Sequence, residues 1–148
     1  MSCIRFNTSA QRAQNAELTN GVVHSDDPVA QFLSPAVTAT KIARLRAMAK
    51  DPNPKIRASV AASYHAPDEV YAALAADADP EVRSWIARNE HVPCDILRSL
   101  VNDPDEKVRS FLAVNYYVPA DTMETLADDT SWQVRALVDW KSKLAVSA

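Results

Sequence analysis

Arginine side chains recur at a fixed interval in this chain, and a row of guanidinium groups is a candidate binding site. The interval is 26 residues at every step, and a column of aspartates keeps the same register without a gap. One interpretation is that the arginines bind phosphate groups or an acidic peptide. In the other, each arginine pairs with an aspartate of an adjacent turn, Arg83 with Asp77 or Asp103 for example, and ties neighbouring segments together. Because the two columns keep step, we favour this structural ladder. Its members are Arg57, Arg83, Arg109, Arg135, Asp51, Asp77, Asp103 and Asp129.

A second set of chemically versatile side chains stands just before a column of prolines. The pairs Tyr64-His65, Glu90-His91 and Tyr116-Tyr117 occupy equivalent positions. Tyrosine and histidine next to proline form a rigid, amphipathic surface that binds at low entropic cost. The alternative is that these rings only cover helix ends. Two tryptophans are secondary contact candidates. The candidate partner-binding residues are Tyr64, His65, His91, Tyr116, Tyr117, Trp132 and Trp140.

The shared column of His65 and His91 raises the possibility of a metal site. Equivalent residues of stacked helices lie about 8–10 Å apart, whereas zinc binds each histidine nitrogen at about 2.0–2.1 Å. The two histidines are therefore expected to lie too far apart to share a metal ion.

The motifs of common enzyme classes are missing from the sequence. The chain has no GxSxG or HExxH motif, and its single glycine argues against a phosphate-binding loop. We therefore predict no metal, no cofactor and no enzymatic activity.

Short helices in pairs are predicted to position all of these residues. One column holds preferred N-cap types, and proline follows two of them at the first helical position. Apolar residues then fall at i, i+3 and i+4, as in Val82, Trp85 and Ile86. Helices of about ten residues are marginal alone, so they must stack on their neighbours. The N-cap column is Asn53, Asp79, Asp105 and Ser131.

The end of the first helix of each pair is predicted near Ser63, Asn89 and Asn115. Asparagine is the second choice after glycine for the left-handed residue that closes a helix. The proline column then opens the second helix. This column is Pro67, Pro93 and Pro119.

The 26-residue register divides the chain into units. We predict a weakly structured arm over 1–25 and a single helical-repeat domain over 26–148. A degenerate first unit, with a helix "VAQFL" and another over about 36–49, precedes the regular units, and the last unit is a cap because terminal repeats are atypical. The divisions are 26–50 for the degenerate unit, 51–76, 77–102 and 103–128 for the regular repeats, and 129–148 for the C-terminal capping unit.

The stretch "VRSWIARNEHVPCDILRSLVNDPDEKVR" resembles the leucine-rich repeat variant family, and "DPxxxVR" is similar to short HEAT-like repeats more generally. The resemblance covers about residues 48–140. It implies an all-α, right-handed α-solenoid of two-helix repeats, an ARM-type superhelix. The period of 26 is slightly longer than that family's usual repeat. The family's iron–sulfur cysteine cluster cannot be carried over, because only Cys3 lies in the corresponding region.

Charge and cysteine content bound the class of partner. The net charge is −3, with +2 on residues 1–47 and −5 on the rest. The repeated units, called the array below, are therefore acidic, which disfavours binding to nucleic acid. A nucleic-acid interface stays open as the alternative, because basic residues cluster before the array. We expect no structural disulfide between Cys3 and Cys94, no membrane segment, a cytoplasmic location, and a monomer or weak homo-oligomer. The preferred function is an adaptor or scaffold for a protein or peptide partner. The basic cluster is Lys41, Arg44, Arg46 and Lys50.

Overall fold

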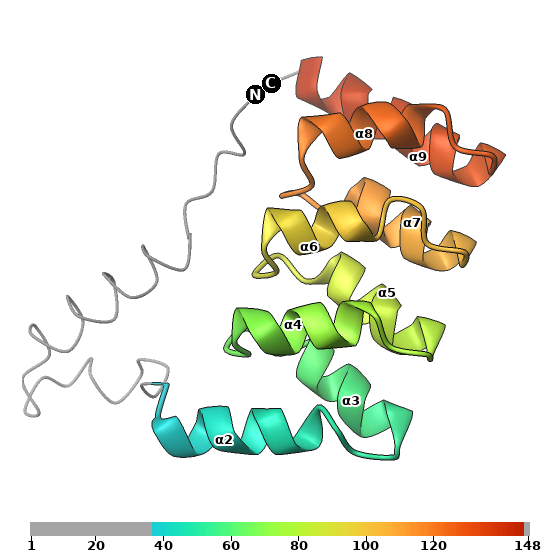
Figure 1. Cartoon of the computed structure of the whole chain (residues 1–148). Coiled ribbons are helices and arrows are strands. Elements are labelled where there is room, and N and C mark those ends of the chain that lie inside the picture. The colour runs from blue at the N-terminus through green and yellow to red at the C-terminus, as the bar shows by residue number, and fades with distance from the viewer. Residues whose placement is uncertain (1–36, 147–148) are drawn as a thin grey trace, which may run out of the picture.

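The computed structural model describes residues 37–146, which form eight helices and no strand (Figure 1). The prediction of an all-α protein is confirmed for this part of the chain. None of the described helices is long and apolar enough to cross a membrane. The helices are α2 (Ala39–Met48), α3 (Pro54–Ala61), α4 (Asp68–Ala75), α5 (Pro80–Arg88), α6 (Cys94–Ser99), α7 (Glu106–Val114), α8 (Ala120–Ala127) and α9 (Trp132–Val146).

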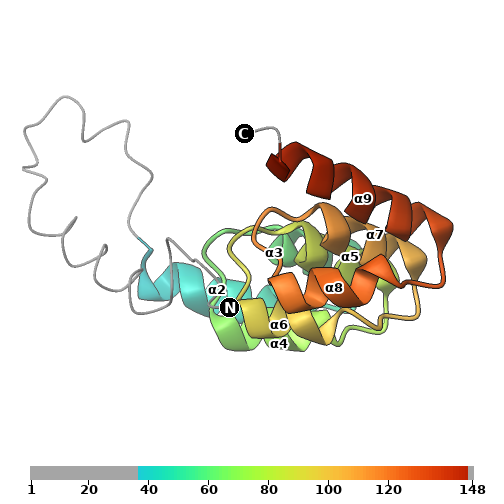
Figure 2. The ribbon, with the colours of Figure 1, turned by 90° about the horizontal axis from the view of Figure 1, so that it is seen from above.

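The helices lie in two rows. One row holds α3, α5, α7 and α9, each packed on the next, and the other holds α2, α4, α6 and α8 (Figures 1 and 2). The core fills the space between the rows and is formed by apolar side chains at helical spacing, which bury one face of each short helix. Burying a leucine or valine side chain contributes about 1.5–3 kcal/mol, so these helices are stabilised mainly by their neighbours. The largest fully buried side chains are Tyr71, Leu74, Ile86, Leu97, Leu112, Leu126, Val60, Val82, Val92, Val108 and Val134.

Two kinds of turn alternate along the array. The Asp turns lead into the odd-numbered helices and comprise residues 49–53, 76–79, 100–105 and 128–131. The Asn turns lead from an odd-numbered helix into the next even-numbered one and comprise residues 62–67, 89–93 and 115–119. Because the two kinds lie at opposite ends of the odd-numbered helices, they form two separate edges of the molecule.

The starts of the odd-numbered helices follow the predicted cap residues. Asn53 Oδ1 accepts a hydrogen bond from Lys55 N at 3.0 Å, and Asp79 and Asp105 cap α5 and α7 in the same way. The hydroxyl of Ser131 accepts from the backbone at the start of α9. Each cap satisfies an amide that would otherwise lack an intrahelical partner. The N-cap column is therefore confirmed.

The even-numbered helices α4, α6 and α8 begin directly after Pro67, Pro93 and Pro119, as predicted. The helix α2 begins at Ala39 rather than near residue 36, because Thr38 caps it by accepting from Lys41 N at 3.2 Å. The predicted helix "VAQFL" and the arm over 1–25 lie outside the described residues. Each predicted regular unit, 51–76, 77–102 and 103–128, contains one odd-numbered and one even-numbered helix.

Candidate functional site

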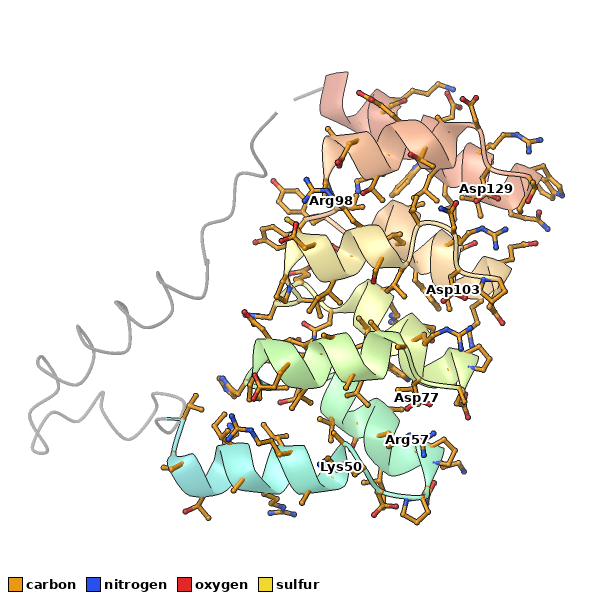
Figure 3. The ribbon with its side chains drawn as sticks, viewed as in Figure 1. Lys50, Arg57, Asp77, Arg98, Asp103 and Asp129 are labelled. Atoms are coloured by element: carbon orange, nitrogen blue, oxygen red, sulfur yellow. The ribbon has the colours of Figure 1, made fainter. Side chains whose placement is uncertain are left out.

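Three arginines of the ladder clamp an aspartate that lies 20 residues further along the chain (Figure 3). Arg83 Nε donates to Asp103 Oδ2 at 2.7 Å and Nη2 donates to Oδ1 at 2.9 Å. The same two-pronged contact joins Arg57 to Asp77 and Arg109 to Asp129. Bidentate pairs between guanidinium and carboxylate are among the strongest side-chain contacts. Of the two partners that the sequence left open for Arg83, its carboxylate contact is to Asp103.

The third guanidinium nitrogen of each arginine binds the turn before its own helix. Arg83 Nη1 donates to the carbonyl of Asp77 at 2.8 Å, and Arg57 and Arg109 make the equivalent contact. Each arginine therefore joins two consecutive Asp turns. With all three nitrogens engaged and the side chain largely buried, these groups have little left with which to bind phosphate.

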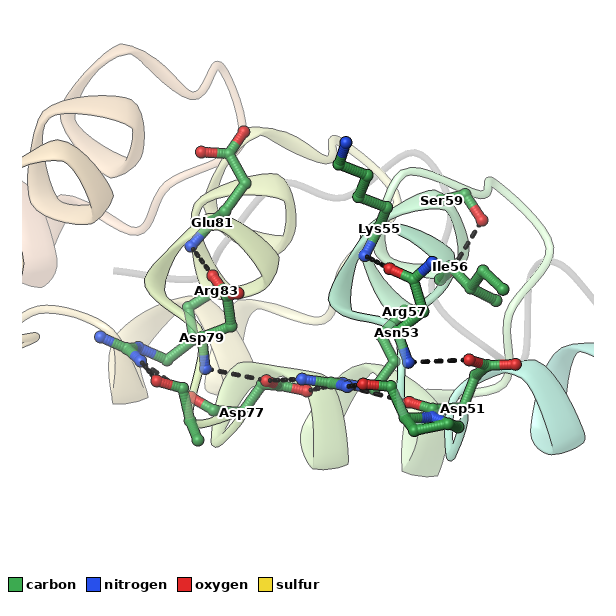
Figure 4. Close-up of polar contacts among 12 residues, drawn as sticks. Asp51, Asn53, Lys55, Ile56, Arg57, Ser59, Asp77, Asp79, Glu81 and Arg83 are labelled. Atoms are coloured by element: carbon green, nitrogen blue, oxygen red, sulfur yellow. Dashed lines mark hydrogen bonds and ion pairs between the residues drawn. The ribbon is translucent and has the colours of Figure 1, made fainter.

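The three clamped aspartates have a second task (Figure 4), whereas for Asp51 no arginine clamp is found among the described residues. Asp77 Oδ1 accepts from Asp79 N at 2.9 Å while the carboxylate holds Arg57. The hydrogen bond from Arg57 is the main cause that lowers the pKa of Asp77, and Arg109 lowers the pKa of Asp129 in the same way. Asp51, Asp103 and Asp129 accept the same backbone hydrogen bond. One carboxylate thus ties two helices and shapes the entry to the next, a double role that the sequence pattern did not predict.

The ladder ends at Arg135. Its Nη1 donates to the carbonyls of Asp129 and Thr130. Among the described residues no carboxylate pairs with it, and its side chain is exposed. Arg135 is therefore a member of the column in sequence register but does not clamp a further turn within 37–146.

The asparagines of the Asn turns do not close their helices in the left-handed conformation. Asn89 has φ −76° and ψ 120°, and Asn115 has φ −63° and ψ 127°. Within the described residues no backbone φ is positive. The prediction of a left-handed asparagine is therefore wrong, because the side chains are needed for a contact between turns that fixes the backbone in an extended conformation.

Asn115 is buried and reaches back to the preceding turn. Its Nδ2 donates to the carbonyl of Ala87 at 2.7 Å and to that of Asn89 at 3.4 Å, while its Oδ1 accepts from Tyr117 N at 2.8 Å. Asn89 makes the same contacts one register earlier, with the carbonyls of Ala61 and Ser63 and with His91 N. A buried amide with its donors and acceptor satisfied is a strong tie. The signal that predicts it is the 26-residue spacing of the asparagines themselves.

Lys141 occupies the next position of the asparagine column. Its Nζ donates to the carbonyls of Ala113 and Asn115 and lies 4.0 Å from Met123 Sδ. These two carbonyls lie 26 residues after those of Ala87 and Asn89, which Asn115 binds. Burial lowers the pKa of Lys141 to about 8. An ammonium group thus replaces the amide at the C-terminal side of the array.

The candidate aromatic edge lies on the Asn turns. The rings of Tyr64 and His91 come from consecutive turns and stack with centroids 4.6 Å apart, and Tyr116 meets Tyr117 edge to face at 5.1 Å. Tyr116 is 78% exposed and Tyr64 61% exposed. His65 is partly buried, and burial, with a smaller effect of Lys41, lowers its pKa. Exposed rings therefore stand on turns whose backbone the asparagine side chains hold in place.

Trp132 and Trp140 lie on α9, two helical turns apart, and both are exposed. They are outside the Asn turns, so the structure divides the predicted contact residues between two surfaces. The first is the aromatic edge of Tyr64, His65, His91, Tyr116 and Tyr117, and the second is the exposed face of α9.

The basic cluster lies on α2 and just after it (Figure 3). Arg46 is engaged by Glu69 of α4, with Nη2 and Oε1 2.6 Å apart, and this hydrogen bond lowers the pKa of Glu69. Arg44 and Lys50 are exposed and Lys41 is partly buried. One of the four cations is thus already neutralised by the array.

Arg98 forms a second tie of this kind, which the sequence did not predict. Its Nε lies 2.8 Å from Asp121 Oδ2, and so it joins α6 to α8 as Arg46 joins α2 to α4. Both pairs span 23 residues, a spacing that a search for periodic ion pairs can detect. Because these pairs are exposed, solvent screens them and they contribute little to stability.

The cysteine chemistry differs from the prediction. Cys94, the first residue of α6, is disulfide-bonded, so the expectation of no structural disulfide is wrong. A disulfide depends on a Cα separation of about 4.4–6.8 Å, which distance along the sequence does not measure. Unpaired cysteines therefore no longer support a cytoplasmic location. Over residues 37–146 the structure has no group of three or more His, Cys, Asp or Glu side chains that could hold a metal ion.

Comparison of the chain with protein-family models, with curated proteins and with solved structures finds no match. The geometry of the two edges therefore carries the functional argument.

Proposed function

We propose that the protein is a non-enzymatic binding module, an adaptor or scaffold that presents its aromatic edge to a protein or peptide partner. In this proposal the two rows of helices are a right-handed α-solenoid of 26-residue, two-helix repeats, similar to leucine-rich repeat variant and HEAT-like proteins. The solenoid supplies a rigid frame, and the Asn turns supply the contacts.

The observation that carries this proposal is the exposure of Tyr116 on a turn that is fixed from behind. Its ring is 78% exposed, while the preceding Asn115 is buried and hydrogen-bonded to the turn before it. Exposed tyrosine rings on a pre-organised backbone lose little entropy on binding and are enriched at protein interfaces. Functional residues also concentrate on loops that a rigid scaffold positions. Tyr64, two registers earlier, is 61% exposed, and the turn that carries it is held by Asn89, whose Nδ2 donates to the carbonyl of Ser63.

A nucleic-acid interface on α2 is the alternative, supported by the exposure of Arg44 and Lys50. The pairing of Arg46 with Glu69 and the burial of the three clamping arginines leave few cations for phosphate. This alternative predicts binding to duplex DNA that weakens steeply with salt. A gel-retardation assay at low salt that shows no complex would remove it.

The double variant Tyr116→Ala/Tyr117→Ala tests the proposed function. Pull-down from a lysate of the source cells, with and without nuclease, should recover a partner with the wild type and lose it with this variant. The matched control is Val37→Ala, which removes an exposed apolar side chain outside both candidate surfaces and should leave capture unchanged. Equal helicity and melting temperature of the three proteins make the comparison valid. A double variant that still captures every partner would show that the aromatic edge is not the binding surface.

A further inference from the structure

A groove of about 510 Å³ lies between α3 and α5. Its floor is formed by small side chains of the α3 segment, Ala58, Ser59 and Ala62, and Trp85 of α5 lines it from the other side. Charged groups stand at the starts of the two helices, where Figure 4 shows Lys55 and Glu81 pointing the same way. The groove is separate from the aromatic edge.

The next pair of odd-numbered helices shows what fits such a groove. The residue equivalent to Ala62, 26 positions later, is Arg88. Its Cζ lies 4.6 Å from the centroid of Trp85 and 4.7 Å from the centroid of Phe111, so the guanidinium contacts rings from both α5 and α7. Between α3 and α5 the corresponding side chain is a methyl group. The groove is the space that an arginine side chain fills one register later.

The charges of the residues that line the groove also suit a guanidinium group. The carboxylates of Asp79 and Glu81 line it, against the single cation of Lys55. Glu81 also pairs with Lys107 at 2.7 Å, but both side chains are more than half exposed, so this pair is weak and does not prevent a second contact. A guanidinium is flat, stacks on an aromatic ring and donates several hydrogen bonds at once. A neutral side chain of the same shape would stack without satisfying the carboxylates.

We propose that this groove binds an arginine side chain presented by a partner peptide, with its guanidinium on Trp85 and its charge facing Asp79 and Glu81. The inference rests on the proposed peptide-binding function, because it names a side chain that such a partner carries. It adds a contact surface between α3 and α5, the first two helices of the odd-numbered row.

The test uses two short probes and the indole N–H resonances of the three tryptophans. The peptide acetyl-Ala-Ala-Arg-Ala-Ala-amide should shift the Trp85 resonance saturably and leave those of Trp132 and Trp140 in place. The matching peptide with citrulline, an uncharged isostere of arginine, should bind at least fivefold more weakly. Assignment of the resonance comes from Trp85→Phe. An unmoved Trp85 resonance, or equal affinity for the two peptides, would overturn the proposal.

The variant Ala62→Arg provides the sharpest control, because it places the protein's own arginine in the groove, as Arg88 does one register later. It should lower the affinity for the arginine peptide at least tenfold. Ala72→Arg makes the same change at an exposed position of α4, and it should bind within twofold of the wild type. If Ala62→Arg does not fold, Glu81→Gln decides instead, and it should weaken binding at least threefold. Wild-type affinity in whichever of these two groove variants folds would contradict the proposal.

Failure of this inference and failure of the proposed function give different results. If the arginine peptide does not bind, but Tyr116→Ala/Tyr117→Ala still loses the partner, the groove inference alone is wrong. If no captured protein depends on the aromatic edge, the proposed function is wrong regardless of the peptide titration.

Discussion

The Asp turns and the Asn turns hold neighbouring helices together by different chemistry. At the Asp turns an arginine side chain binds an aspartate side chain of the following turn, as Arg83 binds Asp103. At the Asn turns an amide side chain binds backbone carbonyls of the preceding turn, as Asn115 binds Ala87. The first tie needs two matched residues, whereas the second needs only one, because every residue has a carbonyl.

This difference explains where the chain can vary. An Asp turn must keep its aspartate, its cap and the matching arginine. An Asn turn such as 89–93 must keep its asparagine, its proline and the buried Val92, so only the two residues after the asparagine are free to differ, as Glu90-His91 and Tyr116-Tyr117 do. The Asn turns are therefore the edge on which different contact residues can be placed without loosening the array.

The largest effect is expected from breaking an Asn turn. Asn115→Ala leaves the carbonyls of Ala87 and Asn89 and the amide of Tyr117 without their side-chain partner in a buried place. We expect a loss of about 3 kcal/mol in the free energy of unfolding, since each buried unsatisfied group costs about 1–3 kcal/mol. Urea unfolding followed by circular dichroism measures it. A loss in the free energy of unfolding below about 0.5 kcal/mol, the range of ordinary surface substitutions, would contradict the role given to the amide.

Breaking an Asp turn comes next. Arg109→Ala removes the clamp on Asp129 and the contact to the carbonyl of Asp103. The expected loss is about 2 kcal/mol, because hydrogen bonds to charged groups contribute about 1.5–3 kcal/mol and Asp129 keeps its bond from Ser131 N. A double-mutant cycle with Asp129→Asn should give a coupling energy well above zero. Additive effects of the two substitutions would show that the pair is not a unit.

Lowering the pH should change the free energy of unfolding through the Asp turns but not through the Asn turns. This effect is smaller than that of the substitutions above. The arginine hydrogen bonds lower the pKa of Asp77 and Asp129 in the folded state. Their stabilisation is therefore complete above the unfolded pKa of about 3.9 and is lost as the pH falls through the lower folded pKa. Asp129→Asn should reduce the drop in unfolding free energy between pH 5 and pH 2.5, whereas Asn115→Ala should leave that drop unchanged. Equal drops in wild type and Asp129→Asn would contradict this assignment.

The smallest effect is expected at the end of the ladder. Arg135 is exposed and, within the described part of the chain, binds only the carbonyls of Asp129 and Thr130. Arg135→Ala should therefore cost less than about 0.5 kcal/mol, the range of ordinary surface substitutions. It is the matched control for Arg109→Ala, since both replace an arginine of the same column. A loss equal to that of Arg109→Ala would mean that the carboxylate clamp contributes little.

Much of the helical arrangement could be predicted from local chemistry. Asn53, Asp79 and Asp105 are cap residues by type, and Pro67 and its equivalents cannot continue a helix, so the bounds of the helices follow from single positions. The register of arginines and aspartates likewise indicated pairing, because both charges recur together.

The contacts that could not be predicted depend on where a side chain points. The sequence does not tell whether Asn89 ends its helix through a left-handed backbone or sends its amide to the preceding turn, because both use the same residue at the same place. The groove beside Trp85 depends on the missing volume of Ala62 relative to Arg88, which a residue pattern shows only once the helices are known to be neighbours. The disulfide of Cys94 depends on a distance in space alone.

The constant register of the two ties has a consequence for how long such a protein can be. Removal of residues 77–102 would bring Arg57 to Asp103 and Asn115 to the carbonyls of Ala61 and Ser63, so that each clamp and each amide tie is replaced by one of the same kind. The segment 77–102 both receives and supplies one clamp and one amide tie. The chain can therefore gain or lose whole segments during evolution without any new interface, and its reach can be adjusted in steps of one helical pair.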